Sequence, residues 1–130
     1  MLMVISNPPN SNVRAVLDMG TASVNSNTIT LATILFDPSS PSGTATVTPV
    51  ALNTQYASTA PVCTVVAGGG HGVSYTGGTV IQNIYVATTM VFTPTDAVLS
   101  PGHSLAVVYT FSSSTNTGIM AIRWFEIPLT

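Results

Sequence analysis

The residues that could do chemistry in this 130-residue chain are few and widely spaced. A hydrolytic triad needs a nucleophile, a base and an orienting acid. His71 and His103 are the only histidines, and serine is so frequent that a serine near either one in sequence carries little information. The stretch "SPGHS" around His103 lacks the Gly-x-Ser-x-Gly elbow of many hydrolases. We expect no catalytic site, and a hydrolase built on His71 or His103 is the alternative.

Metal and cofactor sites have equally weak signals. A structural zinc site usually takes four ligands that include closely spaced cysteines, and Cys63 is the only cysteine. The run "GGGHG" has no following lysine to complete a phosphate-binding loop. We therefore expect no cofactor and no metal. One alternative stays open, in which His71 or His103 from each subunit binds a metal at a symmetry axis.

Charge is scarce throughout the chain. Only 5% of the residues are charged, against 45% that are hydrophobic, and lysine is absent. Nucleic-acid binding depends on clustered Arg and Lys, and adsorption to anionic membranes uses basic segments. Neither nucleic acid nor a membrane is an expected partner. The six charged residues are Arg14, Asp18, Asp37, Asp96, Arg123 and Glu126.

The amino-terminal stretch and the single cysteine bear on where the protein is made. "MLMVISNPPNSN" has no positively charged region, and its apolar run is short for a signal peptide. A single cysteine cannot form an internal disulfide, and Cys63 is expected to be a small buried residue. We expect synthesis in a cytoplasm without export by the general secretory pathway.

Apolar and polar residues alternate with a period of two, and Gly or Pro interrupts them at short intervals. This pattern predicts an all-β protein, an antiparallel β-sandwich or jelly roll of about eight strands. Residues 1–12 are predicted to be an extended amino-terminal arm or first edge strand, and residues 13–130 a single sandwich domain. The predicted strands are 2–6, 13–19, 28–36, 43–51, 62–67, 79–92 (two strands, or one with a bulge), 104–112 and 118–127.

Shorter signals predict the connections. "DPSSPSG" should join two antiparallel strands, and "LSPGHSL" should place Pro101 and Gly102 at the centre of a type II turn. "GGGHG" and "TGG" frame a short strand around Val73 and Tyr75.

Two segments, "TITLATILF" and "GIMAIRWFEIPL", are apolar on both faces. Such strands must be covered on both sides, so a loop, the amino-terminal arm or another subunit must supply a second cover. Trp124 is expected in the core or an interface. Arg123 needs an acidic partner, for which Glu126, Asp18 or a neighbouring subunit are the candidates. The candidate interface residues are Met3, Ile5, Leu35, Phe36, Arg123, Trp124 and Phe125.

The extended "MLMVISNPPNSN", the Thr-rich "GTATVT" and "TITLATILF", the turn and strand "LSPGHSLAVVYTF" and the apolar "IMAIRWFEIPL" together resemble small virion proteins, especially capsid decoration (cement) proteins of tailed bacteriophages. The resemblance implies a non-enzymatic structural protein of the virion that binds and stabilises a viral shell as a homo-oligomer, with a trimer favoured. Its partner would be the major capsid protein or another virion protein.

Other functions compete with this one. A receptor- or glycan-binding module of a phage tail fibre or spike would use exposed, clustered aromatic side chains. A bacterial surface domain exported by a route that the sequence does not reveal is a further alternative.

Overall fold

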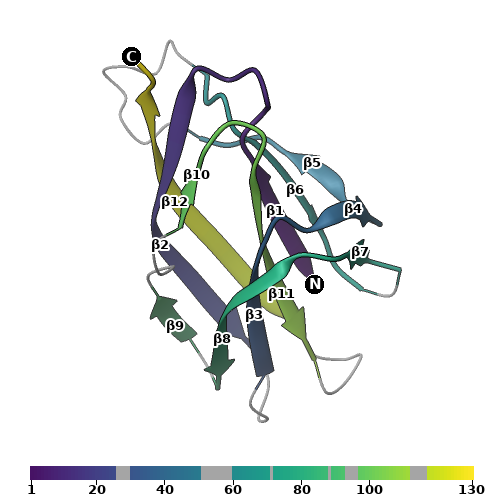
Figure 1. Ribbon diagram of the computed structural model, residues 1–130. Coiled ribbons are helices and arrows are strands. Elements are labelled where there is room, and N and C mark those ends of the chain that lie inside the picture. The colour runs from purple at the N-terminus through teal and green to yellow at the C-terminus, as the bar shows by residue number, and fades with distance from the viewer. Residues whose placement is uncertain (26–29, 51–59, 71, 88, 93–96, 112–116) are drawn as a thin grey trace.

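The computed structural model describes residues 1–25, 30–50, 60–70, 72–87, 89–92, 97–111 and 117–130. These residues form strands joined by turns (Figure 1), and no helix among them is long and apolar enough to cross a membrane. Parts of the predicted ranges, at 28–29, 51, 88 and 112, lie outside the described residues. The strands are β1 (Leu2–Ser6), β2 (Val13–Val24), β3 (Thr30–Phe36), β4 (Ser39–Ser42), β5 (Ala45–Val47), β6 (Thr64–Gly68), β7 (Ser74–Thr76), β8 (Thr79–Val86), β9 (Thr89–Phe92), β10 (Val98–Leu99), β11 (Ser104–Thr110) and β12 (Gly118–Pro128).

The predicted all-β antiparallel sandwich is confirmed, with twelve described strands in place of about eight. The predicted segment 79–92 is two strands, β8 and β9. The predicted segment 43–51 contains only β5 among its described residues, preceded by the separate strand β4. β10 is a two-residue strand, which is too short for a period to be visible in the sequence.

The larger sheet has six strands in the order β5-β6-β1-β11-β3-β8. β1 lies in its interior and pairs with β6 on one side and β11 on the other. The sequence predicted an arm or first edge strand over residues 1–12, so this position is a correction. Its physical reason is visible in "MLMVIS", because Leu2 and Val4 are buried on one face and Ile5 on the other. A strand that is apolar on both faces belongs inside a sheet.

The smaller sheet is built on β2, which pairs with β12 along one side and with β9 and β10 along the other. The β2–β12 register runs from Val13 opposite Pro128 to Val24 opposite Gly118. It shifts at one place, where Arg123 faces Met19 and Trp124 faces Leu17. The extra residue at this bulge is Asp18 in β2, so β12 itself keeps an unbroken alternation.

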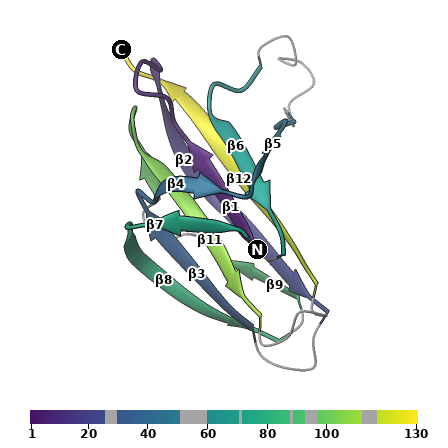
Figure 2. The same cartoon turned by 90° about the vertical axis from the view of Figure 1, so that its right-hand side faces the viewer.

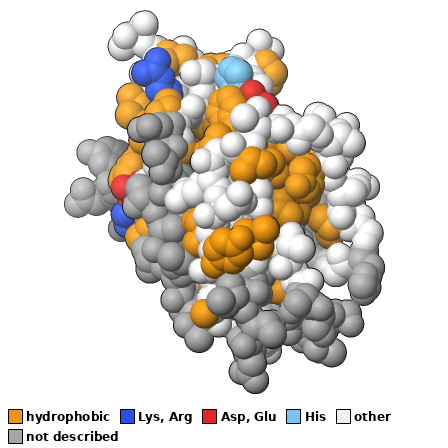
Figure 3. All heavy atoms as spheres, turned by 60° about the horizontal axis from the view of Figure 1, so that its bottom comes forward, with side chains coloured by type: hydrophobic (Ala, Val, Ile, Leu, Met, Phe, Trp, Pro, Cys, Tyr) orange, Lys and Arg blue, Asp and Glu red, His pale blue; other side chains and the backbone are white. Residues whose placement is uncertain are grey.

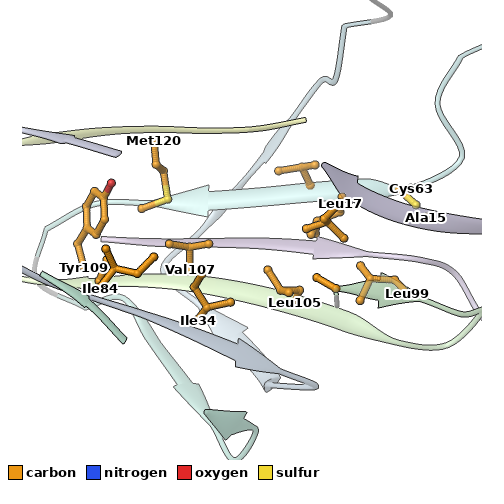
Figure 4. Close-up of a cluster of buried hydrophobic side chains, with 14 of the residues drawn as sticks. Ala15, Leu17, Ile34, Cys63, Ile84, Leu99, Leu105, Val107, Tyr109 and Met120 are labelled. Carbon is orange, nitrogen blue, oxygen red and sulfur yellow. The ribbon is translucent and has the colours of Figure 1, made fainter. Parts of the chain in front are cut away.

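The main core fills the space between the two sheets. Figure 4 shows side chains of both layers directed toward this space, among them Leu17 and Met120 from the smaller sheet. Leu105, Val107 and Ile34 come from the larger sheet and are also buried. The burial of such side chains supplies most of the free energy that holds two sheets together.

A second apolar cluster lies on the other face of the larger sheet, where β4 and β7 pair and cross over its strands (Figure 2). The buried side chains of Leu2, Val4, Leu35 and Ala106 pack there against Val73 and Tyr75. The predicted second cover for this sheet is therefore the chain's own short strand around Tyr75. β7 itself was predicted by the glycine runs on either side of it.

A buried asparagine fastens the two sheets together at one end. Asn7 is 1% exposed. Its side-chain amide donates hydrogen bonds of 2.9 Å to the carbonyl oxygens of Val13 and Leu99, and its side-chain oxygen accepts one from Ser11. Its main-chain carbonyl accepts the N–H of Gly102 at 2.9 Å. The residues "SNPPNSN" are thus part of the fold, because the asparagine satisfies buried and part-buried main-chain groups.

The predicted type II turn is present. The N–H of His103 donates to the carbonyl of Ser100 at 3.1 Å, and Gly102 has a φ of 87°. A type II turn requires a positive φ at its third residue, which glycine adopts without steric cost. The turn leads directly into β11.

Candidate interaction surface

The face of the smaller sheet turned away from the core carries exposed apolar side chains. We call it the outer face. In β12, Met120, Ile122, Trp124 and Glu126 are buried or half-buried, and the residues between them are exposed. Ile119 is 73% exposed, Phe125 55% and Ile127 51%. Monomeric soluble proteins scatter such residues singly, whereas β12 presents three on one face.

Strand register extends the apolar surface across the sheet. Val98 of β10 pairs with Val16 of β2, and Val16 pairs with Phe125 of β12. These three side chains form one row across three strands, since paired residues in a sheet point to the same face. The next pair along is Arg14 with Ile127, and Arg14 is exposed. In the described part of the outer face, Arg14 therefore lies beside an apolar row.

The other charges on this face neutralise each other. Arg123 donates hydrogen bonds to Asp18, one of them from Nε to Oδ2 at 2.7 Å. Asp18 is the acidic partner for Arg123 among the three candidates that the sequence left open. The bulge at Asp18 places the carboxylate beside the arginine, and an exposed pair of this kind contributes about 0–1 kcal/mol.

Glu126 points the other way, into the molecule. Its carboxylate accepts the main-chain N–H groups of Val62 and Cys63, each at 2.8 Å, and the indole N–H of Trp124 at 3.1 Å. Burial raises the pKa of Glu126, but the hydrogen bonds outweigh burial and hold the pKa below its ordinary value. Glu126 thus ties β12 to the segment that leads into β6.

Cys63 is 2% exposed, as expected for a free cysteine in a core. Burial, followed by the charge of Glu126 and a hydrogen bond to it, raises the pKa of the Cys63 thiol to about 12. The thiolate is the reactive form, so we expect this cysteine to be unreactive while the chain is folded.

The closest approach to a catalytic arrangement is the pair Asp37 and His103. Nδ1 of His103 lies 2.7 Å from Oδ2 of Asp37, and the Phe36 ring stacks on the imidazole with centroids 5.3 Å apart. Oδ1 of Asp37 accepts the N–H of Ser104 at 2.9 Å. The hydroxyl of Ser104 reaches the carbonyl of Pro38 at 3.5 Å and not the imidazole. The carboxylate orients the histidine, but a nucleophile bonded to His103 is absent from the described residues.

Of the two histidines, only His103 lies within the described residues. His71 lies outside the described residues, as do Tyr56 and Asp96. Within the described ranges, no three His, Cys, Asp or Glu side chains converge as metal ligands. The symmetry-axis metal site stays a prediction.

The seven predicted interface residues lie in different surroundings. Ile5 and Leu35 are buried within the chain, and Met3 and Phe36 are half-buried against the main core. Trp124 is half-buried there too. The outer face brings together only Arg123 and Phe125. Three further apolar residues of that face were not among the predicted residues; they are Val98, Ile119 and Ile127. Alternation along β12 places Ile119 and Ile127 on the face of Phe125, whereas Val98 joins them only through the register of β10 with β2.

Exposed aromatic side chains are not clustered in the described part of the chain. Tyr85 is 69% exposed on β8 of the larger sheet, and Phe125 lies on β12 of the smaller sheet. A sugar platform of neighbouring aromatic rings is therefore not formed by the described residues.

Charge is sparse on the surface as well as in the sequence. In Figure 3, hydrophobic side chains gather in separate patches among neutral polar atoms, and the coloured charged side chains lie toward the rim of the view. Comparison of the chain with protein-family models, with curated proteins and with solved structures finds no match. The surface geometry is therefore the basis for assigning a function.

Proposed function

We propose that the protein is a non-enzymatic structural protein of a virion, which binds a viral shell as a homo-oligomer and stabilises it by covering junctions between shell subunits. The observation that carries this proposal is the exposed apolar outer face, with its row of Val98, Val16 and Phe125. An apolar row of this kind on a sheet face is typical of a protein-binding surface.

Scarce charge favours an assembled state. A chain with a net charge of −2 and no lysine has little electrostatic repulsion to keep its copies apart. In an assembly, uncharged strands such as β5, whose residues are all exposed, would pack among neighbours without that repulsion. The proposed partner is the major capsid protein or another virion protein, and the resemblance to decoration proteins favours a trimer.

The proposed adhesion depends on apolar contacts more than on ion pairs. Among the described residues, the outer face has one ion pair, Arg123 with Asp18, and one further cation, Arg14. Salt screens exposed charges but does not weaken apolar burial. Binding to the shell should therefore withstand high salt.

A co-sedimentation experiment tests the proposal. The purified protein is mixed with shells assembled from the major capsid protein of the virus that encodes it, in low and in high salt. We expect co-sedimentation in both. We expect Phe125→Asp to bind weakly. Tyr85 is an even more exposed aromatic on the other sheet, and Tyr85→Asp should bind like the unaltered protein. Failure to co-sediment, or release by moderate salt, would overturn the proposal.

A further inference from the structure

The edges of the two sheets differ in how well they are protected against pairing with another chain. Natural edge strands are usually short, bulged or rich in lysine. β5 has only three residues. β8 carries a bulge, because Leu35 pairs with Val80 while Ile34 pairs with Gln82, which leaves Ile81 as the extra residue. These two edges of the larger sheet therefore have common protections.

β12 has neither protection. It is eleven residues long, and its side-chain alternation is unbroken because the bulge in this sheet belongs to β2. Within the described residues, β12 makes its main-chain ladder with β2 alone. A proline stands only at its end, Pro128. The donors and acceptors along its other side form a template for one more strand.

We propose that a second copy of this chain occupies the β12 edge, in an antiparallel pairing about a two-fold axis at Ile122. The register follows from the side chains of the outer face. With the axis at Ile122, the exposed Ile119 of each copy lies directly opposite Phe125 of the other. The contact therefore contains two Ile119–Phe125 pairs. The short Ala121 lies opposite the long Arg123, which leaves room for the arginine and its own Asp18.

Charge distinguishes this register from the two registers whose axes lie one residue away, at Arg123 and at Ala121. An axis at Arg123 would place two arginines directly opposite each other, and directly opposed like charges destabilise a sheet. An axis at Ala121 would place Arg123 opposite Ile119 and Phe125 opposite the polar Thr117. Of these three axes, only the one at Ile122 pairs Ile119 with Phe125 and keeps the arginines on a diagonal, about 7–8 Å apart.

Pairing at this edge would join the two smaller sheets into one continuous sheet. Their outer faces would then form a single apolar surface, twice as wide as that of one copy. The inference deepens the proposed function by assigning one contact of the homo-oligomer. A two-fold contact joins copies in pairs, so it predicts an even number of subunits. The resemblance to decoration proteins favours three.

Charge substitutions at the two opposed positions test the inference by sedimentation velocity over a range of protein concentrations. We expect the unaltered protein to dimerise, and Ile119→Glu or Phe125→Lys alone to raise the dissociation constant roughly 100-fold, because each places an unpaired charge in the contact. The double variant I119E/F125K should regain most of the lost affinity, because each new glutamate lies opposite a new lysine. These positions are exposed in one copy, so circular dichroism should show an unchanged fold for all variants.

A matched double variant tests the register. I119E/I127K has the same charges, but the axis at Ile122 places residue 127 only diagonally to residue 119 of the other copy, so it should regain much less affinity than I119E/F125K. A monomeric unaltered protein, single variants that dimerise normally, or recovery in I119E/I127K and not in I119E/F125K would each overturn the inference. The sedimentation velocity experiment contains no shell. A failure to dimerise can therefore be told apart from a failure to bind the shell.

Discussion

The side-chain amide of Asn7 donates a hydrogen bond of 2.9 Å to the carbonyl oxygen of Leu99, and so joins the end of β1 to β10 of the opposite sheet. The same amide donates to the carbonyl of Val13 at 2.9 Å, where β2 begins. A residue in what looks like a polar linker thus holds together the end of β1, the start of β2 and the end of β10.

Substituting Asn7 by alanine should destabilise the protein. The buried carbonyl of Leu99 and the part-buried carbonyl of Val13 would each lose the amide donor, and an unsatisfied buried group costs about 1–3 kcal/mol. We expect Asn7→Ala to lower the free energy of unfolding by about 3 kcal/mol in urea denaturation. Asn10→Ala, at an exposed position in the same segment, is the control and should change stability by less than about 0.5 kcal/mol. Equal effects of the two substitutions would contradict the role given to Asn7.

Removing the Tyr75 ring should expose the second apolar cluster. Tyr75 packs from β7 onto the cluster formed by Leu2, Val4, Leu35 and Ala106. We expect Tyr75→Ala to lower the free energy of unfolding by about 2–3 kcal/mol, since it removes a half-buried aromatic side chain. Tyr85→Ala removes the same ring from an exposed position and should have almost no effect. If both variants unfold at the same denaturant concentration, β7 does not stabilise the larger sheet.

Glu126 should make stability depend on acid pH. Its pKa is lower in the folded chain than its ordinary value of 4.5, so the carboxylate stabilises the fold at neutral pH. This contribution is lost as the pH falls below 4.5 toward the lower, folded-state value. Glu126→Gln should be less stable than the unaltered protein at pH 7, and the difference should shrink as the pH falls to 3. A difference that grows on acidification would contradict this sign.

Cys63 should resist thiol reagents while the chain is folded. The thiol is buried, and its pKa is raised to about 12, so thiolate is scarce at neutral pH. We expect no reaction with an aromatic disulfide reagent in native buffer and full reaction in denaturant. Rapid labelling in native buffer would show that the segment between Pro61 and β6 opens readily.

The period-two pattern was enough to predict the sandwich, Pro101 and Gly102 predicted the turn, and the glycine runs predicted the strand at Tyr75, because these depend on local sequence. It was not enough for β1, whose interior place depends on pairing with β6 and β11, which are distant in sequence. The same limit applies to the candidate surface. Arg123 and Phe125 were predicted, but Val98 joins them only through the register of β10 with β2.

A strand that is apolar on both faces does not by itself predict a contact with another subunit, as the cover over the larger sheet shows. "TITLATILF" needed a cover on both sides, and for β3 the chain itself supplies one through β7. "GIMAIRWFEIPL" has no such cover over Ile119 and Phe125 in the described residues. The distinction depends on where one short strand crosses, which no local pattern predicts.

The most direct test of assembly is the mass of the unaltered protein in solution, measured by sedimentation equilibrium in low and in high salt. The exposed apolar outer face and the scarcity of charge predict a species of two or more 13.4 kDa chains in both conditions. A single species of 13.4 kDa at every concentration and in both salts would contradict it.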